Sequence, residues 1–276
     1  MKQLLKISGF LLFTLLLMVR CENPNQYEFE PELVLNGQLN AGQSIDSIYV
    51  SLSADILAKY NTFSQRVTGA EVTINGVQLN EYNNLPGVYY YPNRSYKVQS
   101  EETYRIDVKA GDKEVSSETT VPPLFNFTAQ GVSDGDTVQY VPGISFFSNA
   151  FFTLTWPGYN GSKIYRIISL ADVANQNNFI EDDRPEADVF KGEEKDRINP
   201  AMWWVADEYA RINWMFFNYT GWHSIIVSAM DDNYYDYRNG ILFGEQSGQN
   251  FNSIVKGGYG LFASSASDTL RIYLVE

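Results

Sequence analysis

Cysteine and histidine are almost missing from this chain of 276 residues, which has one of each. A single cysteine excludes an intramolecular disulfide and a cysteine-rich zinc site. The single histidine, His223, begins an apolar stretch that predicts a strand, where its neighbour Ser224 would point to the opposite face. The two side chains therefore cannot act together as base and nucleophile of a Ser-His-Asp triad.

Motifs for catalysis and cofactor binding are missing as well. The string nearest to a nucleophile elbow, "GEQSGQ" at 244–249, has the wrong spacing. The glycine-rich "KGGYG" at 256–260 follows no strand-to-helix signal, so it predicts a turn and not a phosphate cradle. Glu181, Asp182 and Asp183 are consecutive and lack the alternating spacing of calcium loops. We therefore expect no enzymatic activity, no cofactor and no metal.

Positive charge is scarce, with 20 lysines and arginines against 33 aspartates and glutamates and a net charge of −13. A surface this acidic repels phosphate backbones and anionic lipid headgroups. The charge balance therefore argues against nucleic acid as a partner.

The N-terminal residues 1–20 have the composition of a targeting segment. Lys2 and Lys6 precede an uncharged apolar run from residue 7 to residue 19. This run is shorter than the about 20 residues of a membrane-spanning helix and fits the apolar region of a signal peptide.

The run ends next to Cys21, the pattern of bacterial lipoprotein export, in which the thiol receives a diacylglyceryl group and becomes the first residue. Arg20 stands where such sites usually carry a small residue, and an ordinary secretory signal with a chance cysteine is the alternative. We expect a lipoprotein signal peptide at 1–20, lipidation of Cys21 and a polar tether at 21–30.

Alternating side chains predict strands from about residue 31 onward. Apolar Ile48, Val50 and Leu52 alternate with Tyr49 and polar residues, and strand-like runs recur at spacings of roughly 8–12 residues, which is typical of a β-sandwich. The Asn75–Gly76 pair between two such runs predicts a tight hairpin, and "AGDK" at 110–113 predicts a second turn. No segment within 31–121 has a helical pattern.

A second β-rich domain is expected at 125–276, after Pro122–Pro123. Its "WPGYNGSKIYRI" is similar to a fibronectin-type strand, turn and strand. We expect a long insertion at about 175–215, with a charged, aperiodic part at 175–200. The stretch 200–217 fits a short helix or an irregular strand pair. Residues 223–231 predict a strand, and residues 232–243 predict one or two helical turns that end at Asn239–Gly240.

Aromatic residues are abundant and are the main candidates for a binding surface. Those from the tryptophan-rich stretch and from the following helical segment are Trp203, Trp204, Trp214, Trp222, Tyr234, Tyr235 and Tyr237. Core packing is the plain interpretation of any one of them. The functional interpretation is an exposed platform, because tryptophan and tyrosine stack on sugar rings and anchor protein interfaces. Trp203 and Trp204 cannot both enter the same core if they lie on a strand.

Several of these stretches together resemble a family of Bacteroidota outer-membrane lipoproteins, domain-of-unknown-function family 4249. They include "PELVLNGQLN" at 31–40, "VTGAEVTINGVQL" at 67–79 and "TYRIDVKAGDKEVSSETTVP" at 103–122. The more specific ones are a tyrosine cluster after a strand that ends in aspartate, and an Asn-x-x-x-x-Gly-Gly-x-Gly-x-Phe loop. Their residues are Tyr234, Tyr235, Tyr237, Asn252, Gly257, Gly258, Gly260 and Phe262.

The resemblance implies a mostly β fold, with an N-terminal Ig-like or carboxypeptidase-regulatory-like sandwich at 31–121. It also implies a place in the outer membrane and genes that stand beside TonB-dependent receptors. We therefore expect a lipid-anchored protein without enzymatic activity that accompanies a TonB-dependent nutrient transporter. The alternatives are a stand-alone surface protein that binds a glycan or a peptide, and a structural component of the envelope.

Overall fold

The computed structural model describes residues 29–55, 61, 63–141, 152–158, 162–180, 199–213, 216–247 and 254–276. Cys21, Asn252 and the expected acidic triplet at 181–183 lie outside these ranges. All the strands and helices described below belong to one compact unit, residues 32–53 and 59–276. Within the described residues, no helix has both the length and the apolar character needed to cross a bilayer.

The first sandwich is built from two sheets. One sheet has the order β4-β3-β7-β8, and the other contains β1, β2, β6 and β5. The bounds are β1 Leu33–Asn40, β2 Ile48–Leu52, β3 Glu71–Ile74, β4 Val77–Gln78, β5 Asn80–Tyr82, β6 Leu85–Tyr90, β7 Thr103–Ala110 and β8 Lys113–Thr120. Side chains of both sheets, such as Leu35, Val50, Val72 and Ile106, form one buried cluster between them. The predicted mostly β fold and N-terminal sandwich are confirmed.

Both predicted turns of this sandwich are confirmed. Asn75 and Gly76, between β3 and β4, have φ of 49° and 78°, the left-handed conformation that a two-residue hairpin needs at both positions. Gly111 follows β7 with φ of 64°, and β7 and β8 pair in register along their full length. Local sequence was sufficient here because each turn depends on its own residues.

The second sandwich contains the remaining strands. A three-stranded sheet has the order β14-β11-β9, and the opposite layer has the order β13-β12-β15-β16. The bounds are β9 Thr128–Gln130, β10 Thr137–Gln139, β11 Phe152–Thr155, β12 Tyr165–Ala171, β13 Ala201–Val205, β14 Tyr209–Ile212, β15 Gly221–Met230 and β16 Tyr259–Val275, with a short 3-10 helix η1 at Gln176–Asn178. Leu154, Ile167, Ile212, Val227 and Ile272 share the second core between the layers.

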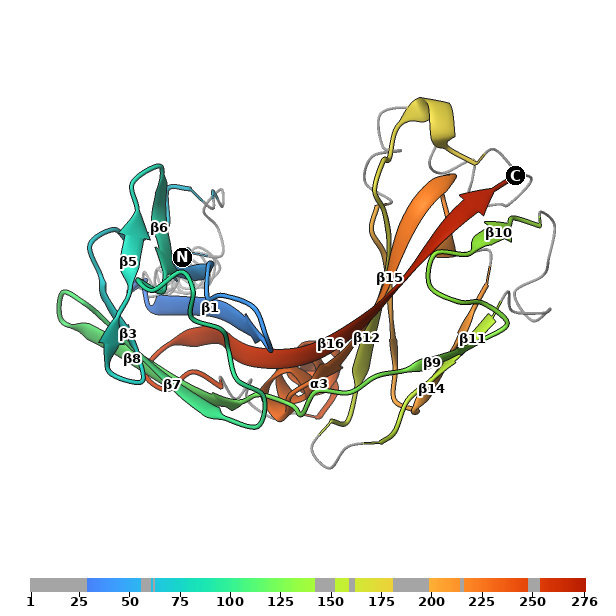
Figure 1. Cartoon of the computed structure of the whole chain (residues 1–276). Coiled ribbons are helices and arrows are strands. Elements are labelled where there is room, and N and C mark those ends of the chain that lie inside the picture. The colour runs from blue at the N-terminus through green and yellow to red at the C-terminus, as the bar shows by residue number, and fades with distance from the viewer. Residues whose placement is uncertain are drawn as a thin grey trace, which may run out of the picture. The chain divides into compact units, whose positions relative to one another are not determined.

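Strand β16 joins the two sandwiches into one nine-stranded sheet (Figure 1). Its first part, from Tyr259 to Ser265, pairs with β1 in parallel, and the part from Ser265 to Leu274 pairs with β15. Phe262 is buried in the first core, whereas Leu270 is buried in the second. The expected boundary near residue 121 stays a prediction, and the structure adds that the C-terminal strand contributes to both cores.

The stretch 200–217, for which a short helix and a strand pair were both open, contains two strands. They do not pair with each other, because β13 pairs with β12 and β14 pairs with β11. Both lie within the expected insertion at about 175–215, so this part of the chain supplies one strand to each layer of the second sandwich.

The prediction for the helix at 232–243 was wrong at its end. Helix α3 extends over Asp232–Ser247 and passes through Asn239–Gly240. Gly240 does not have the positive φ of a left-handed residue, so it does not form a C-cap. Glycine costs a helix only about 1 kcal/mol relative to alanine, which does not force the helix to end.

The glycine-rich loop before β16 is a close-approach turn, as its sequence predicts. Gly260 has φ of 114°, and a side chain at this position would overlap the carbonyl oxygen of Leu35. A side chain at Gly258 would overlap the carbonyl oxygen of Leu33. The glycines therefore let β16 begin directly against β1.

Candidate functional site

The neighbouring Trp203 and Trp204 lie on opposite faces of β13. The indole of Trp203 stacks on Phe216, with ring centroids 3.4 Å apart, and packs against the second core. Trp204 points the other way and is half-buried. The prediction that the two cannot share a core is confirmed, and Trp203 is removed from the candidate platform. Trp214 lies outside the described residues.

Trp204 packs against side chains of helix α3. Tyr234 stacks on its indole at 5.1 Å between centroids, and the guanidinium of Arg238 lies 5.4 Å from the indole centroid. Tyr235 is contacted instead by the ammonium of Lys163, 5.3 Å from its ring centroid, and Tyr237 is half-buried. Tyr234 is thus a candidate tyrosine that the structure brings to a candidate tryptophan.

Trp222 lies at the start of β15 and is 41% exposed. It pairs across the strands with Tyr273, which is 38% exposed, and their rings meet edge to face at 5.3 Å. Arg271 lies 5.1 Å from the indole centroid of Trp222 and forms an ion pair with Asp172. Ser228 of β15 lies opposite Arg166, which in turn lies opposite Trp204. Six residues separate Ser228 from Trp222 along the strand, a distance of about 20 Å.

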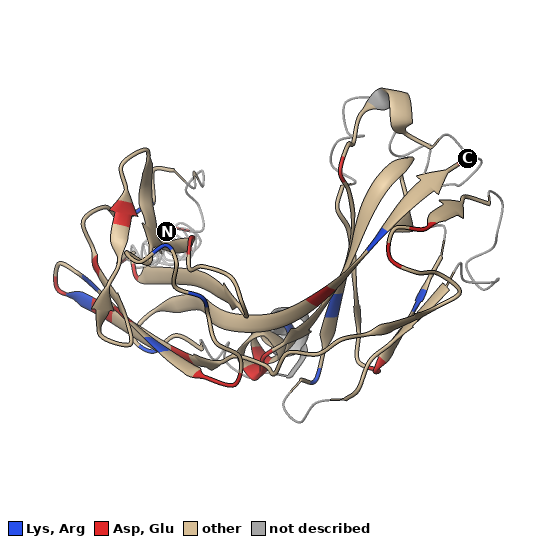
Figure 2. Ribbon diagram, viewed as in Figure 1, with Lys and Arg blue, Asp and Glu red and all other residues tan. Residues whose placement is uncertain are grey.

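These residues belong to one sheet surface, which we call the outer face. It consists of the side chains of β13, β12, β15 and β16 that point away from the second core. They are Met202, Trp204, Arg166, Ile168, Leu170, Trp222, Ser224, Ile226, Ser228, Ser267, Thr269, Arg271 and Tyr273. None of these thirteen is a carboxylate, and charged positions are sparse along β15 and β16 (Figure 2). The outer face is thus apolar, aromatic and hydroxyl-bearing.

Arg166 is the central charge of the outer face, between Trp204 on β13 and Ser228 on β15. Its Nε is buried and has no hydrogen-bond partner. Burial lowers the pKa of this guanidinium, because the charged form has lost part of its hydration. The phenol of Tyr234 acts against burial and raises this pKa.

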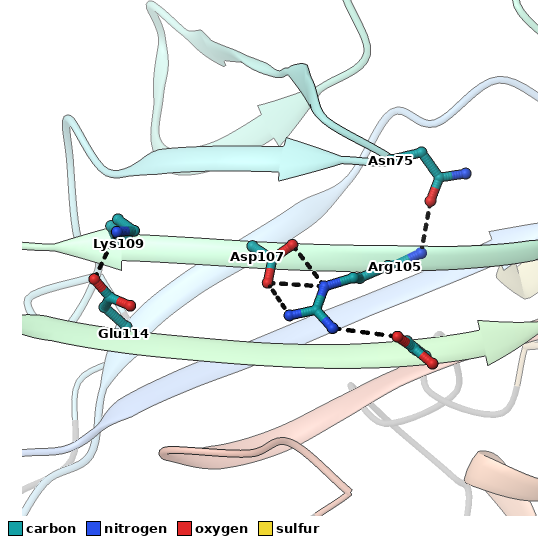
Figure 3. Close-up of polar contacts among 6 residues, drawn as sticks. Asn75, Arg105, Asp107, Lys109 and Glu114 are labelled. Atoms are coloured by element: carbon teal, nitrogen blue, oxygen red, sulfur yellow. Dashed lines mark hydrogen bonds and ion pairs between the residues drawn. The ribbon is translucent and has the colours of Figure 1, made fainter.

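Arg105 on β7 shows what an arginine with partners looks like in the same chain. Its guanidinium bonds to Asp107 at 2.6 Å and to Glu118 at 3.3 Å, as Figure 3 shows for Asp107. These carboxylates raise the pKa of Arg105. Arg166 forms no such ion pair with the described residues. Sequence reasoning missed this residue. Its signal in the sequence is a lone charge in the apolar strand "YRIISLA".

A second polar region is a cavity of about 480 Å³ beside the start of α3, lined on its polar side by Glu101, Glu118, Asp231, Asp232 and Asn233. Asp231 caps the helix by accepting a hydrogen bond from the N–H of Tyr234 at 3.0 Å. Burial raises the pKa of this carboxyl to about 6. Sequence reasoning missed Asp231, although an aspartate directly before a helix is an N-cap signal.

The other contacts of this region attach the helix to two strands. Thr119 of β8 donates a hydrogen bond to the carboxylate of Asp231 and lies 2.6 Å from the hydroxyl of Ser264. The amide of Asn233 donates to the carbonyl oxygens of Glu118 and Phe262, at 2.5 and 2.8 Å. Of the residues that line the cavity, Asp231 and Asn233 are thus engaged in holding the start of the helix against the two strands.

His223 is fully buried, so it lies deeper than the partly buried strand residue that the sequence predicts. Its Nδ1 is 3.0 Å from the carbonyl oxygen of Gly221, and its ring meets Phe217 edge to face. Burial lowers its pKa. Ser224 points to the outer face, so the predicted separation of the two side chains is confirmed. Among the described residues, no group of three or more His, Cys, Asp or Glu side chains is placed to hold a metal.

Comparisons with known proteins add a family. A model described as "Domain of unknown function (DUF4249)" matches residues 22–271. No curated protein matches the chain. A SusE-like, surface-located polysaccharide-binding protein from the Bacteroides thetaiotaomicron heparin utilisation locus is 9% identical, with a TM-score of 0.23, over 88% of this chain and 33% of its own. The chain thus spans about a third of that protein's length.

The two N-terminal domains of human protocadherin-24 are also 9% identical, with a TM-score of 0.20, over 89% of this chain and 98% of theirs.

Proposed function

We propose that this chain, which belongs to the DUF4249 family, is a lipid-anchored binding protein of the outer membrane without enzymatic activity. In this proposal the outer face holds the ligand, and the protein accompanies a TonB-dependent transporter. The observation that carries the proposal is the outer face itself, an open sheet surface with Met202 54%, Trp222 41% and Tyr273 38% exposed. Exposed apolar surface of this kind marks interaction sites in soluble domains.

The absence of a catalytic arrangement supports binding over turnover. Among the described residues, the one histidine is buried in the second core, and the buried carboxylate Asp231 caps a helix. Neither group faces the outer face. A binding surface needs only complementary shape and chemistry, which the aromatic and hydroxyl side chains of the outer face provide.

The transporter partner is tested by recovery from native membranes. A C-terminally tagged full chain is purified from gently solubilised membranes of the native host, and the proteins that accompany it are identified. Stoichiometric recovery of a β-barrel receptor supports the accessory role. Recovery of the tagged chain alone contradicts a stable complex and leaves the second candidate, a stand-alone surface binding protein, which the exposed Trp222–Tyr273 pair favours.

The anchor is tested with Cys21→Ser, because a diacylglyceryl group needs the thiol. The wild-type chain is expected in the membrane fraction and labelled by radioactive palmitate, and the variant in the soluble fraction without label. Membrane association of the unlabelled variant would contradict the anchor.

The role of the outer face is tested with Met202→Asp, which places a carboxylate among its apolar side chains. Leu85→Asp is the matched control, because Leu85 is also exposed, at 43%, but lies on β6 of the first sandwich. Affinity electrophoresis in gels that contain neutral or acidic polysaccharides measures binding. We expect retardation of wild type and Leu85→Asp by at least one polysaccharide, and its loss in Met202→Asp.

A further inference from the structure

The charge of the outer face is opposite to that of the chain. The protein has a net charge of −13, yet the thirteen positions of the outer face carry two arginines and no carboxylate. Arg271 is neutralised by Asp172. Arg166 has no such partner among the described residues, so within them the uncompensated charge of the face is positive and lies next to Trp204.

A second arginine is brought to the same place by helix α3. Arg238 lies over the indole of Trp204, whose ring also stacks on Tyr234. Burial raises the pKa of Tyr234, and the charges of Arg166 and Arg238 both oppose that rise, so both guanidiniums lie near its hydroxyl. We call Arg166, Trp204, Tyr234 and Arg238 the arginine–aromatic cluster.

The arginine–aromatic cluster lacks the anion that such an arrangement calls for. Over the described part of the chain, neither of its arginines forms an ion pair, and the Nε of Arg166 is buried without a hydrogen bond. Buried or half-buried charges in proteins are normally paired, because an uncompensated charge away from water is costly. Two like charges near the same phenol also repel each other. An external anion removes both costs.

The chemistry of the neighbouring surface indicates what carries that anion. Guanidinium groups bind carboxylates and sulfates through paired, planar hydrogen bonds. From the cluster, the outer face continues for about 20 Å to Trp222 and Tyr273. Ser228 is buried and bonds to Ser267, and the hydroxyls open to a ligand along this path are those of Ser267, Thr269 and the half-buried Ser224. An extended ligand rich in hydroxyls fits this strip, and a small free anion would leave it unused.

We propose that Arg166 and Arg238 hold the acidic groups of an anionic polysaccharide whose chain lies along the outer face toward Trp222 and Tyr273. This inference rests on the proposed function, in that it takes the outer face as the binding surface. The rings of Trp204 and Tyr234 stack on each other, so we expect them to position the arginines rather than to contact the sugar. Sugar rings are expected to contact the exposed Trp222–Tyr273 pair.

The experiment compares three polysaccharides with the full mature chain. Polygalacturonate presents carboxylates, heparin presents sulfates as well, and dextran is neutral. Binding is measured by affinity electrophoresis and isothermal titration for wild type, Arg166→Gln, Arg238→Gln and the control Arg105→Gln. The control loses the same charge from the first sandwich, so it corrects for the change in net charge.

We expect binding to at least one acidic polysaccharide, a loss of at least tenfold in affinity in Arg166→Gln and in Arg238→Gln, and less than a twofold change in Arg105→Gln. Which of the two acidic probes binds distinguishes carboxylate from sulfate recognition. Affinity should also fall as salt rises, since the contact is an ion pair. Thermal unfolding of each variant checks that the fold is retained.

Equal losses in all three variants would overturn the proposal, as would binding of the wild type to dextran alone or to none of the three polysaccharides. Dextran binding that Met202→Asp abolishes would leave the outer face as the ligand surface and reject only the acidic ligand. The proposed function itself would be rejected if the chain bound none of the polysaccharides and no receptor was recovered with it from native membranes.

Discussion

The side chain of Asp231 ends a chain of hydrogen bonds between α3 and two strands. Its carboxylate accepts a hydrogen bond from Thr119, Thr119 lies 2.6 Å from the hydroxyl of Ser264, and Ser264 donates to the carbonyl oxygen of Thr120 at 3.1 Å. Burial favours the neutral carboxyl and raises its pKa, whereas the hydrogen bonds from Thr119 and Ser264 favour the ionised form and lower it. Burial has the larger effect, so the pKa of Asp231 is raised.

The stability of the protein should therefore depend on pH through Asp231. Its pKa is about 6 in the folded protein, against an ordinary value of 3.8. Between these values the folded state binds more protons than the unfolded state, so the contribution of Asp231 to the free energy of unfolding falls as pH rises from about 4 to about 6 and stays low above that range. Asp231→Asn should remove this contribution to the pH dependence.

Urea unfolding of wild type and Asp231→Asn at pH 4.5 and pH 8 measures the effect. Asparagine caps a helix as well as aspartate does and donates to Thr119 without a charge. We expect the variant to match or exceed the wild type at pH 8. A loss of more than about 1 kcal/mol at pH 8 would show that the ionised carboxylate stabilises the fold.

Arg166 should be unfavourable for stability in the absence of a ligand. Replacing an uncompensated, half-buried charge by an apolar side chain of similar length is often neutral or stabilising. We expect Arg166→Met to leave the free energy of unfolding unchanged or to raise it by about 1 kcal/mol. Chemical unfolding of this variant beside Arg105→Met, whose surface ion pairs contribute little, makes the comparison. A loss of about 2 kcal/mol or more would indicate a structural arginine.

At the scale of single elements, the start of β16 depends on glycine. We expect Gly260→Ala to cost about 3 kcal/mol or more, because φ of 114° strains an alanine and its side chain would overlap the carbonyl oxygen of Leu35. Gly42→Ala is the control, since Gly42 has φ of 75° in open space and alanine should cost only about 1 kcal/mol there. Thermal unfolding distinguishes the two, and equal losses would contradict the close-approach argument.

Elements that depend on their own residues could be predicted from the sequence. The Asn75–Gly76 hairpin, the turn after β7 and the strand β15 are of this kind. The end of α3 was missed, because Asn239–Gly240 is a common helix stop, whereas glycine costs a helix interior only about 1 kcal/mol and α3, which packs on β16, continues to Ser247. The strands β13 and β14 looked like a pair because they are neighbours in sequence, whereas each finds its partner in a different sheet.

The candidate site could be predicted only in part for a related reason. Alternation along a strand gave the opposite faces of Trp203 and Trp204, and that prediction was confirmed. The grouping of Trp204 with Arg166 and Arg238 depends on the register of β12 against β13 and on where α3 packs. Neither follows from a local pattern, so the arginine–aromatic cluster was invisible in the sequence.

At the scale of the whole molecule, the first sandwich should not be stable without the C-terminal strand. Residues 31–121 expressed alone lack Phe262, which is buried in the first core, and expose the edge of β1 that pairs with β16. We expect this fragment to show no cooperative thermal unfolding by circular dichroism, in contrast to residues 29–276. A cooperative transition in the fragment would mean that residues 31–121 fold alone.

The pairing of β1 with β16 also has a consequence in time. Asn40 accepts a hydrogen bond from Ser265, 225 residues later, so the sheet of the first sandwich remains open until nearly the whole chain has been made. Contacts this distant in sequence form slowly. A chain exported through a membrane, as the expected leader implies, must cross it unfolded. If the predicted leader directs export, late closure of the first sheet would keep the polypeptide in a transportable state until its last strand is made.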